Sequence, residues 1–306
     1  MTGDRPSQSP PPPPRRTQPG LTLQDQDEQH SDPDRLARWM LEEDGSRDLT
    51  TQLTVPVELV GRAAVEAREE GVLAGQTYAD ALARHVGCRP IAWSGPEGAT
   101  FRPAATVATI EGPLATLLRV ERPLLNTLQR ASGIATLTRR FVEAVAGTRC
   151  KILHTRKTAP GLRAFDVSAV LAGGGQRHRL DLAHEIMIKD NHWQALARAG
   201  RTLAQVLEAA RVRGVKTCYV EAESDSQMEQ ACAAGATRIL VDNQSPDTLR
   251  AWATAARRLS PGIEIEASGG ITLENVRRYA EAGADFISVG ALTHSVKALD
   301  LALRLL

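Results

Sequence analysis

The segment 151–192 of this chain gathers cationic side chains around the glycine triplet Gly173–Gly175. Short apolar runs at 151–155 and 185–188 precede those cations and predict buried strands that end in polar residues. Solvated charge runs lie on amphipathic helices or in disordered segments, so cations that follow apolar strands favour a binding site for a small, highly anionic molecule. The cations of this segment are Arg156, Lys157, Arg163, Arg177, His178, Arg179, Lys189 and His192.

Acidic side chains stand at the ends of two later apolar runs, at Glu221 and Asp242. If both runs are neighbouring parallel strands, the two carboxylates meet at one edge of a sheet. Carboxylates there suit Mg²⁺ held through substrate oxygens, or the hydroxyl groups of a ribose. The alternative is a pair of salt bridges to Lys157 or Lys189, and both arrangements are compatible with each other.

Two glycine-containing turns follow the last two apolar runs. Ser268, Gly269 and Gly270 follow the run 263–267, and Gly290 follows the run 286–289. Loops after the last two strands of an α/β barrel often bind phosphate through backbone N–H groups, and glycine allows a close approach to the anion. A single such turn is a weak signal, but the second turn after an intervening helix predicts a phosphate site.

His178 and Arg179 together predict a carboxylate site, because the planar guanidinium matches carboxylate geometry and the imidazole adds a donor. His154 lies inside an apolar run, so we expect it in the core. The chain has no GxSxG, no HExxH and no GxGxxG after a first strand. A nucleophilic mechanism therefore has no obvious residue to use.

The elements that position these groups alternate. After Lys151, strand-like runs recur with helical segments between them, which predicts a parallel α/β architecture. Each run ends on a polar group, as in an α/β barrel. Six runs are fewer than eight, so we expect a partly open, irregular barrel, or a missed strand near Val170; an open doubly wound sheet is the alternative. The runs are 151–155, 185–190, 216–223, 237–243, 263–270 and 286–290.

The N-terminal part has a different pattern. Residues 1–30 are proline-rich and polar, which predicts a disordered tail. A helix from Pro33 ends at Gly45, and short β-like runs with one helix among them then predict a small sheet. Leucines at three- and four-residue spacing predict a long helix with a break at Gly133. The candidate strands are 62–68, 89–93 and 106–111, and the candidate helices are 78–86 and 113–146.

Composition excludes several classes of function. The net charge of +1 over 306 residues gives the whole chain no electrostatic footprint for nucleic acid or an anionic membrane. No apolar run reaches membrane-spanning length, and the N-terminus has no secretory signal. The four cysteines show no CxxC spacing, which suits a reducing compartment, so we expect a cytoplasmic protein.

Over residues 35–306 the chain resembles the quinolinate phosphoribosyltransferases, also called carboxylating nicotinate-nucleotide pyrophosphorylases. The TRKTAPGLR segment, combined with HR and IKDNH, is highly specific for this family. The motifs that carry the resemblance are TRKTAPGLR (155–163), GGGQRHR (173–179), IKDNH (188–192), VEAE (220–223), LVDN (240–243), EASGGI (266–271) and SVGALTH (288–294).

The resemblance implies a reaction and an architecture. The family makes nicotinate mononucleotide, pyrophosphate and CO₂ from quinolinate and phosphoribosyl pyrophosphate with Mg²⁺, in de novo NAD biosynthesis. It implies an N-terminal α/β sandwich domain at 31–130 and a partly open α/β barrel at 131–295, with a C-terminal helix, 296–306, packed back on the first domain. It also implies a homodimer with sites at the interface.

The resemblance further implies a role for each cation. Arg156, His178 and Arg179 would hold the quinolinate carboxylates. Lys157 and Lys189 would sit between quinolinate and the pyrophosphate. Both lysines belong to the set that we expect to carry the catalysis.

Roles for the remaining residues follow in the same way. Glu221 and Asp242 would serve the ribose and Mg²⁺, and they complete the expected catalytic set. Arg122 resembles the arginine that reaches the neighbouring subunit's site. The residues that would cradle the 5′-phosphate are Ser268, Gly269, Gly270 and Gly290.

A few positions depart from the family's usual pattern. His154 stands where an aspartate is common, and Gln176, Arg177 and Asp181 stand where small or Asn-like residues are usual. These departures affect substrate affinity more than the type of reaction. One alternative function is a molybdenum-transport accessory protein on the same scaffold. Another is a non-catalytic anion-binding protein, which would be expected to lack one of the lysines or carboxylates that are all present here.

Overall fold

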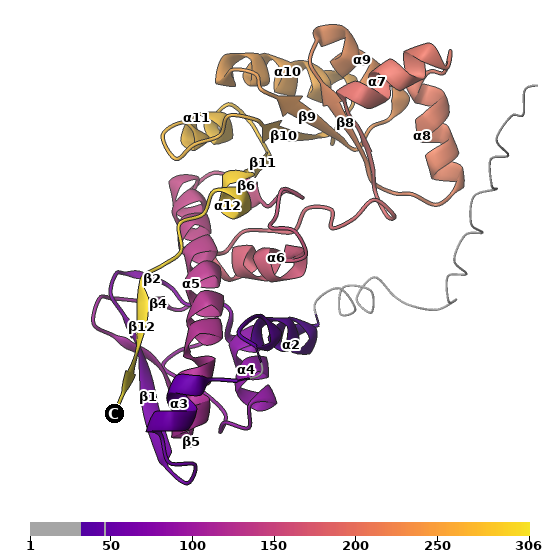
Figure 1. Ribbon diagram of the computed structural model, residues 1–306. Helices are drawn as coiled ribbons and strands as arrows, with labels where there is room; N and C mark the ends of the chain where they lie inside the picture. The colour runs from indigo at the N-terminus through magenta and orange to yellow at the C-terminus, as the bar shows by residue number, and fades with distance from the viewer. Residues whose placement is uncertain (1–31, 46) are drawn as a thin grey trace, which may run out of the picture. The chain divides into compact units, whose positions relative to one another are not determined.

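The computed structural model describes residues 32–45 and 47–306, and Figure 1 shows their helices and strands. The predicted disordered tail at 1–30 lies outside the described residues. Among the residues that are described, no helix is both long enough and apolar enough to cross a membrane.

An antiparallel sheet of order β12-β1-β5-β3 organises the N-terminal part. Long apolar alternation in β1 and β5 buries one face of this sheet, where Val65, Val107 and Ile110 lie at 1% exposure or less. A two-stranded sheet, β2-β4, stands beside it. The strands are β1 (Val60–Ala67), β2 (Gly71–Val72), β3 (Ala92–Trp93), β4 (Thr100–Phe101), β5 (Thr106–Pro113) and β12 (Leu301–Leu305).

Helices cover this sheet, and each begins or packs for a local reason. Asp48 caps one of them by accepting a 3.0 Å hydrogen bond from the Thr51 N–H. The leucines of the longest helix, Leu117, Leu124 and Leu128, are buried against the sheet as their spacing predicts. The helices are α2 (Pro33–Glu43), α3 (Leu49–Thr54), α4 (Gln76–His85) and α5 (Leu114–Ala144).

Helix α5 runs without a break through Gly133, so the prediction of a break there is wrong. A Cβ on Gly133 would lie 2.3 Å from the Lys297 carbonyl oxygen. The glycine is therefore needed for the close passage of the C-terminal segment, and not for a change of direction. The predicted domain boundary at residue 130 falls inside this helix, and the domain assignment stays a prediction.

The C-terminal part contains the predicted six-stranded parallel sheet, in the order β6-β11-β10-β9-β8-β7. The first strand pairs with the last, which is the order of a barrel and not of a doubly wound sheet. No described pairing joins β6 to β7, so the barrel is open between them; an isolated bridge from Leu153 to Gln176 extends the β6 edge. The strands are β6 (Lys151–Leu153), β7 (Ile186–Ile188), β8 (Cys218–Ala222), β9 (Arg238–Asp242), β10 (Glu264–Ser268) and β11 (Phe286–Ser288).

Helices connect these strands, and the main apolar core lies between helices and sheet. The region near Val170 is part of α6, so it adds no seventh strand. The helices are α6 (Arg163–Ala172), α7 (Asp190–Arg198), α8 (Leu203–Val212), α9 (Asp225–Ala234), α10 (Pro246–Leu259), α11 (Val276–Glu281) and α12 (Ala291–His294).

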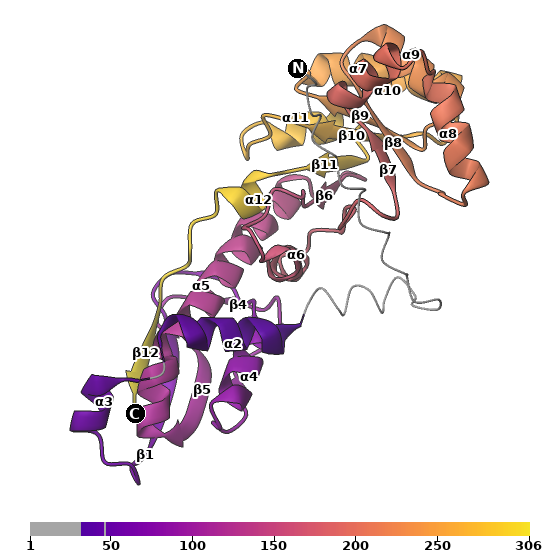
Figure 2. The same ribbon diagram turned by 45° about the vertical axis from the view of Figure 1, so that its right-hand side comes forward.

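The prediction of a C-terminal helix at 296–306 is wrong. Residues Leu301–Leu305 form β12, which pairs antiparallel with β1 and lies beside it in Figure 2. The physical reason is a period of two: Leu299, Leu301 and Leu303 are separated by single residues and belong to the core of the N-terminal sheet. The segment does contact the N-terminal part, but as an edge strand.

Candidate functional site

The carboxyl ends of the parallel strands bring the candidate residues to one edge of the barrel sheet. Asp242 and Ser268 end β9 and β10 and are paired in register, and Glu221 lies near the end of β8. Lys189 directly follows β7, and Gly290 follows β11. Elements far apart in sequence therefore meet because parallel strands present their carboxyl ends on the same side.

Two guanidinium groups, those of Arg156 after β6 and Arg179 after α6, form no ion pair with a carboxylate among the described residues. The Arg156 Nε–H is buried and donates to no acceptor in the described part of the chain. Burial, and then the nearby charge of Arg156, lower the pKa of Arg179 below its usual value. Two desolvated cations close together are stabilised by an anion that contacts both.

His178 is held by the chain through both ring nitrogens. Its Nε2–H donates to Glu266 Oε1 at 3.1 Å, and its Nδ1 accepts from the Arg179 backbone N–H at 2.6 Å. The side chain is 6% exposed. The role of His178 as a direct carboxylate ligand stays a prediction, because in this arrangement the ring has no spare donor.

His154 is fully buried, as its position in an apolar run predicts. Its Nε2 accepts from the His178 backbone N–H at 3.0 Å, and its Nδ1 lies 3.2 Å from the Thr155 carbonyl oxygen, to which it donates. Burial lowers the pKa of His154 to about 4, so the ring is neutral near pH 7. The neutral ring therefore ties the end of β6 to the loop that carries His178.

The four expected catalytic residues differ in their partners. Glu221, whose side chain is 5% exposed, forms an ion pair with Lys189, so one of the predicted salt bridges is present. The carboxylate of Asp242 accepts from Asn243 Nδ2 at 2.7 Å. Neither Asp242 nor the exposed Lys157 pairs with an opposite charge within the described part of the chain. Lys157 and Asp242 thus remain open to a charged ligand.

The predicted phosphate turns have the backbone that such a site needs. Gly269 and Gly270 adopt φ of +83° and +62°, and a Cβ on Gly269 would lie 2.2 Å from Asn243 Oδ1. No described hydrogen bond uses their N–H groups. A Cβ on Gly290 would lie 3.0 Å from the His294 ring and 3.2 Å from the Lys157 side chain. His294 therefore adjoins the site.

Sequence reasoning missed His294, Asp166 and Arg130. The spacing of His294 four residues after Gly290 was a usable signal. Asp166, fully buried on α6, binds Arg130 at 2.8 and 2.9 Å and accepts the Ala159 N–H at 3.0 Å. This pair fixes the loop after Lys157. No periodicity in the sequence identifies it, because its partners come from three separate elements.

Arg122 lies on α5 and is exposed. None of the described contacts links it to the other candidate residues. The structure therefore places it apart from the site of its own chain, two turns before Arg130 along the helix.

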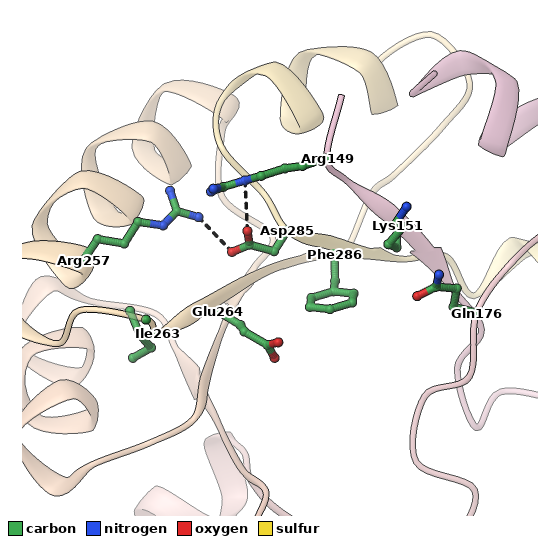
Figure 3. Close-up of a pocket in the computed structure, with 9 residues that line it drawn as sticks. Arg149, Lys151, Gln176, Arg257, Ile263, Glu264, Asp285 and Phe286 are labelled. Carbon is green, nitrogen blue, oxygen red and sulfur yellow. Dashed lines mark hydrogen bonds and ion pairs between the residues drawn. The ribbon is translucent and has the colours of Figure 1, made fainter. Parts of the chain in front are cut away.

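A pocket of about 520 Å³ lies at the other ends of the strands, where β6, β10 and β11 begin. Its cations Arg149 and Arg257 bind Asp285 at 3.0 and 2.8 Å, as Figure 3 shows. Both guanidiniums of this pocket therefore have an internal carboxylate partner, unlike those of Arg156 and Arg179.

Comparisons with known proteins agree with this geometry. The family model for the quinolinate phosphoribosyl transferase N-terminal domain matches residues 48–132, and that for the C-terminal domain matches residues 134–304. The carboxylating nicotinate-nucleotide pyrophosphorylase of Homo sapiens is 42% identical over 248 residues, covering 80% of this chain and 82% of the relative. The probable carboxylating enzyme of Bacillus subtilis is 40% identical over 277 residues, covering 88% and 91%.

Solved structures of nicotinate-nucleotide pyrophosphorylases also have a similar fold. The nicotinate-nucleotide pyrophosphorylase of Francisella tularensis superposes with a TM-score of 0.81 at 32% identity, covering 90% of this chain and 96% of that one. The predicted α/β fold class is confirmed by this likeness and by the two observed sheets.

Proposed function

Because the chain belongs to the quinolinate phosphoribosyl transferase family, it is a phosphoribosyltransferase, and we propose how its residues serve the reaction. The enzyme transfers the phosphoribosyl group from phosphoribosyl pyrophosphate to quinolinate with decarboxylation, giving nicotinate mononucleotide, pyrophosphate and CO₂. This is the reaction predicted from the sequence, and the names of the relatives confirm it over the molybdenum-transport alternative.

The unpaired guanidiniums of Arg156 and Arg179 carry the assignment of the quinolinate site. Quinolinate has two carboxylates on one flat ring, and the guanidinium fork suits a planar carboxylate. The buried Nε of Arg156 gains a partner when such an anion binds. Each charge-assisted hydrogen bond to the substrate contributes about 1.5–3 kcal/mol.

The phosphoribosyl donor takes the other half of the site. The N–H groups of Gly269 and Gly270 face its 5′-phosphate, and Ser268 and Gly290 complete the cradle. Lys157 and Lys189 stabilise the charge of the departing pyrophosphate. Because Lys189 is paired with buried Glu221, its ammonium is held in place before the substrates bind.

The bond changes then need positioning more than acid–base chemistry. The pyridine nitrogen attacks ribose C1′ in line with the leaving oxygen, and the electron pair of the C1′–O bond leaves with pyrophosphate. Glu221 and Asp242 stabilise the positive charge that grows at C1′. The pyridinium ring next accepts the electron pair of the C–CO₂⁻ bond, and a proton replaces CO₂ on that carbon.

Glu221 and Asp242 are also the residues that would hold Mg²⁺ in this proposal, together with the phosphoribosyl donor. Their oxygen ligands fit a hard cation. Within the described chain no three His, Cys, Asp or Glu side chains gather as metal ligands. Oxygens of the substrate would therefore be needed beside these two carboxylates, and Mg²⁺ would supply charge neutralisation for the pyrophosphate.

The assembly in this proposal is a cytoplasmic homodimer in which Arg122 reaches the site of the partner. The exposure of Arg122, with no ion pair to any residue within 32–45 or 47–306, supports this role. Leu53 and Val57 are 86% and 87% exposed near α3 and offer apolar surface for a second copy. The four cysteines are free thiols, which fits a reducing compartment, and the near-neutral net charge fits the absence of nucleic-acid partners.

Purified protein supplied with quinolinate, phosphoribosyl pyrophosphate and Mg²⁺ tests the function. We expect quinolinate absorbance to fall while CO₂ is released in equal amount. Nicotinate in place of quinolinate is the control and should give no product. Turnover of nicotinate, or none with quinolinate from folded protein, would overturn the assignment.

A further inference from the structure

A buried charged network lies beneath the site, inside the barrel. Glu266 on β10 has no exposed surface, and its two oxygens contact different partners. Oε1 accepts from His178 Nε2 at 3.1 Å, and Oε2 accepts from the Arg238 guanidinium at 2.9 Å. Arg238 in turn binds Glu264 at 2.7 Å.

Aromatic rings hold the Arg238 end of this network. The Arg238 guanidinium lies 3.7 Å from the centre of the Phe286 ring and 4.9 Å from that of Tyr219. Arginine stacks on aromatic faces while keeping its in-plane donors for carboxylates, so Arg238 has a single well-defined orientation. Burial alone would raise the pKa of Glu266, but His178 and Arg238 lower it, so the carboxylate is ionised.

The hydrogen bonds fix which nitrogen of His178 carries the proton. Nδ1 accepts from the Arg179 N–H, so it holds a lone pair, and the ring N–H is the one on Nε2, directed at Glu266. A ring held this way presents an acceptor to the Arg179 backbone. The position of that backbone sets where the Arg179 guanidinium can reach.

Such a network is a poor device for stability alone. Removing two ions from water costs free energy, and a well-packed apolar pair of the same volume often gives equal or greater stability. A fully buried Glu266 joined to an arginine of the candidate site through one imidazole is therefore better explained by positioning.

We propose that Glu266 is a positioning residue for quinolinate binding: through His178 it fixes the backbone of Arg179, and with it the guanidinium that lies near Arg156. The inference rests on the proposed quinolinate site. It assigns no contact between Glu266 and either substrate.

The test compares Glu266→Gln with Glu264→Gln as a matched control. Both variants remove a carboxylate that binds Arg238, but Glu264 makes no described contact with His178. Separate dissociation constants are measured calorimetrically for quinolinate and for phosphoribosyl pyrophosphate with the full-length protein. We expect Glu266→Gln to weaken quinolinate binding roughly 10- to 100-fold, the loss of about one charge-assisted contact. Binding of phosphoribosyl pyrophosphate should be unchanged, and the control should bind both like the wild type.

A double-mutant cycle shows whether the effect passes through His178. In a His178→Asn background, which lacks the donor to Glu266, adding Glu266→Gln should weaken quinolinate binding no further. Additive losses would overturn the proposal, as would wild-type quinolinate affinity in Glu266→Gln or equal weakening of both substrates.

A second variant keeps the test available if Glu266→Gln does not fold. Glu266→Asp retains the charge that Arg238 needs but withdraws the oxygen from His178, and it should weaken quinolinate binding selectively. Wild-type affinity in this variant would contradict the proposal. Failure of the wild-type protein to turn over quinolinate would instead refute the proposed function, independently of these variants.

Discussion

His154 makes the stability of this protein depend on pH in a way that can be calculated. The folded state lowers the pKa of His154 from 6.5 to about 4, chiefly through burial. Between those two pH values the unfolded chain carries a proton on this ring and the folded chain does not. The free energy of unfolding therefore falls as the pH falls, by about 1.4 kcal/mol for each pH unit.

Over the window from pH 6.5 to pH 4 the loss from this one group is about 3 kcal/mol. The contribution of this group to stability is fully retained above pH 6.5. The structure gives the reason for its size. A protonated ring would present Nε2–H to the His178 N–H, which lies at 3.0 Å, so two donors would face each other in a fully buried place.

His154→Gln is the matched variant, because its amide oxygen can accept from the same N–H but does not titrate. Urea unfolding of both proteins at pH values from 7.5 to 4 gives the free energy of each. We expect the wild type to lose about 3 kcal/mol more than the variant across the window. Glu266 and the other carboxylates with lowered pKa destabilise both proteins alike in acid, so they cancel in the difference. Parallel curves would refute the reasoning.

Three further outcomes follow from the site. Arg179→Ala should weaken quinolinate binding by about 1.5–3 kcal/mol and spare phosphoribosyl pyrophosphate, and equal titration curves for quinolinate would contradict it. Gly269→Ala should cost about 1–3 kcal/mol of stability and also weaken donor binding, because its Cβ would lie 2.2 Å from Asn243; Gly262→Ala, at φ +93° with open space, should show the strain alone. Asp166→Asn should lower the free energy of unfolding by about 3 kcal/mol because it leaves Arg130 without a carboxylate partner. Asp181→Asn, at a half-exposed position beside His184, should lower it by about 1 kcal/mol or less.

Local periodicity explains which parts of the fold could be predicted. The strand runs after Lys151 are short, apolar and separated by helical segments, which is the pattern of a parallel α/β sheet. The pairing of β6 with β11, which distinguishes a barrel from a doubly wound sheet, could not be predicted from that local pattern. The helix at 296–306 was expected from the family resemblance, whereas the residues themselves place Leu299, Leu301 and Leu303 at a period of two. That pattern decides for a strand only when an edge such as β1 is available, and the edge is more than 200 residues away in sequence.

The site could be predicted only in part because the ion-pair and hydrogen-bond partners of its residues lie far away in the sequence. The sequence shows a cluster of cations but not which of them the fold neutralises. In the structure Lys189 pairs with Glu221, whereas Arg163 donates to the Leu180 carbonyl, a hydrogen bond that leaves its charge uncompensated. His178 binds Glu266, which is 88 residues away in the chain.

Among the cations expected to contact substrate near this edge of the sheet, Arg156, Arg179 and Lys157 have charges that no described carboxylate neutralises. Arg163 likewise has no described carboxylate partner, and its buried Nε has no hydrogen-bond partner. The distinction follows from long-range register, because β10 brings Glu266 beneath the loop of His178 while the loops above leave Arg156 and Arg179 unpaired. A chain with a net charge of +1 can therefore bind two highly anionic molecules. Its carboxylates neutralise the cations that support the site and leave unpaired those that face the substrates.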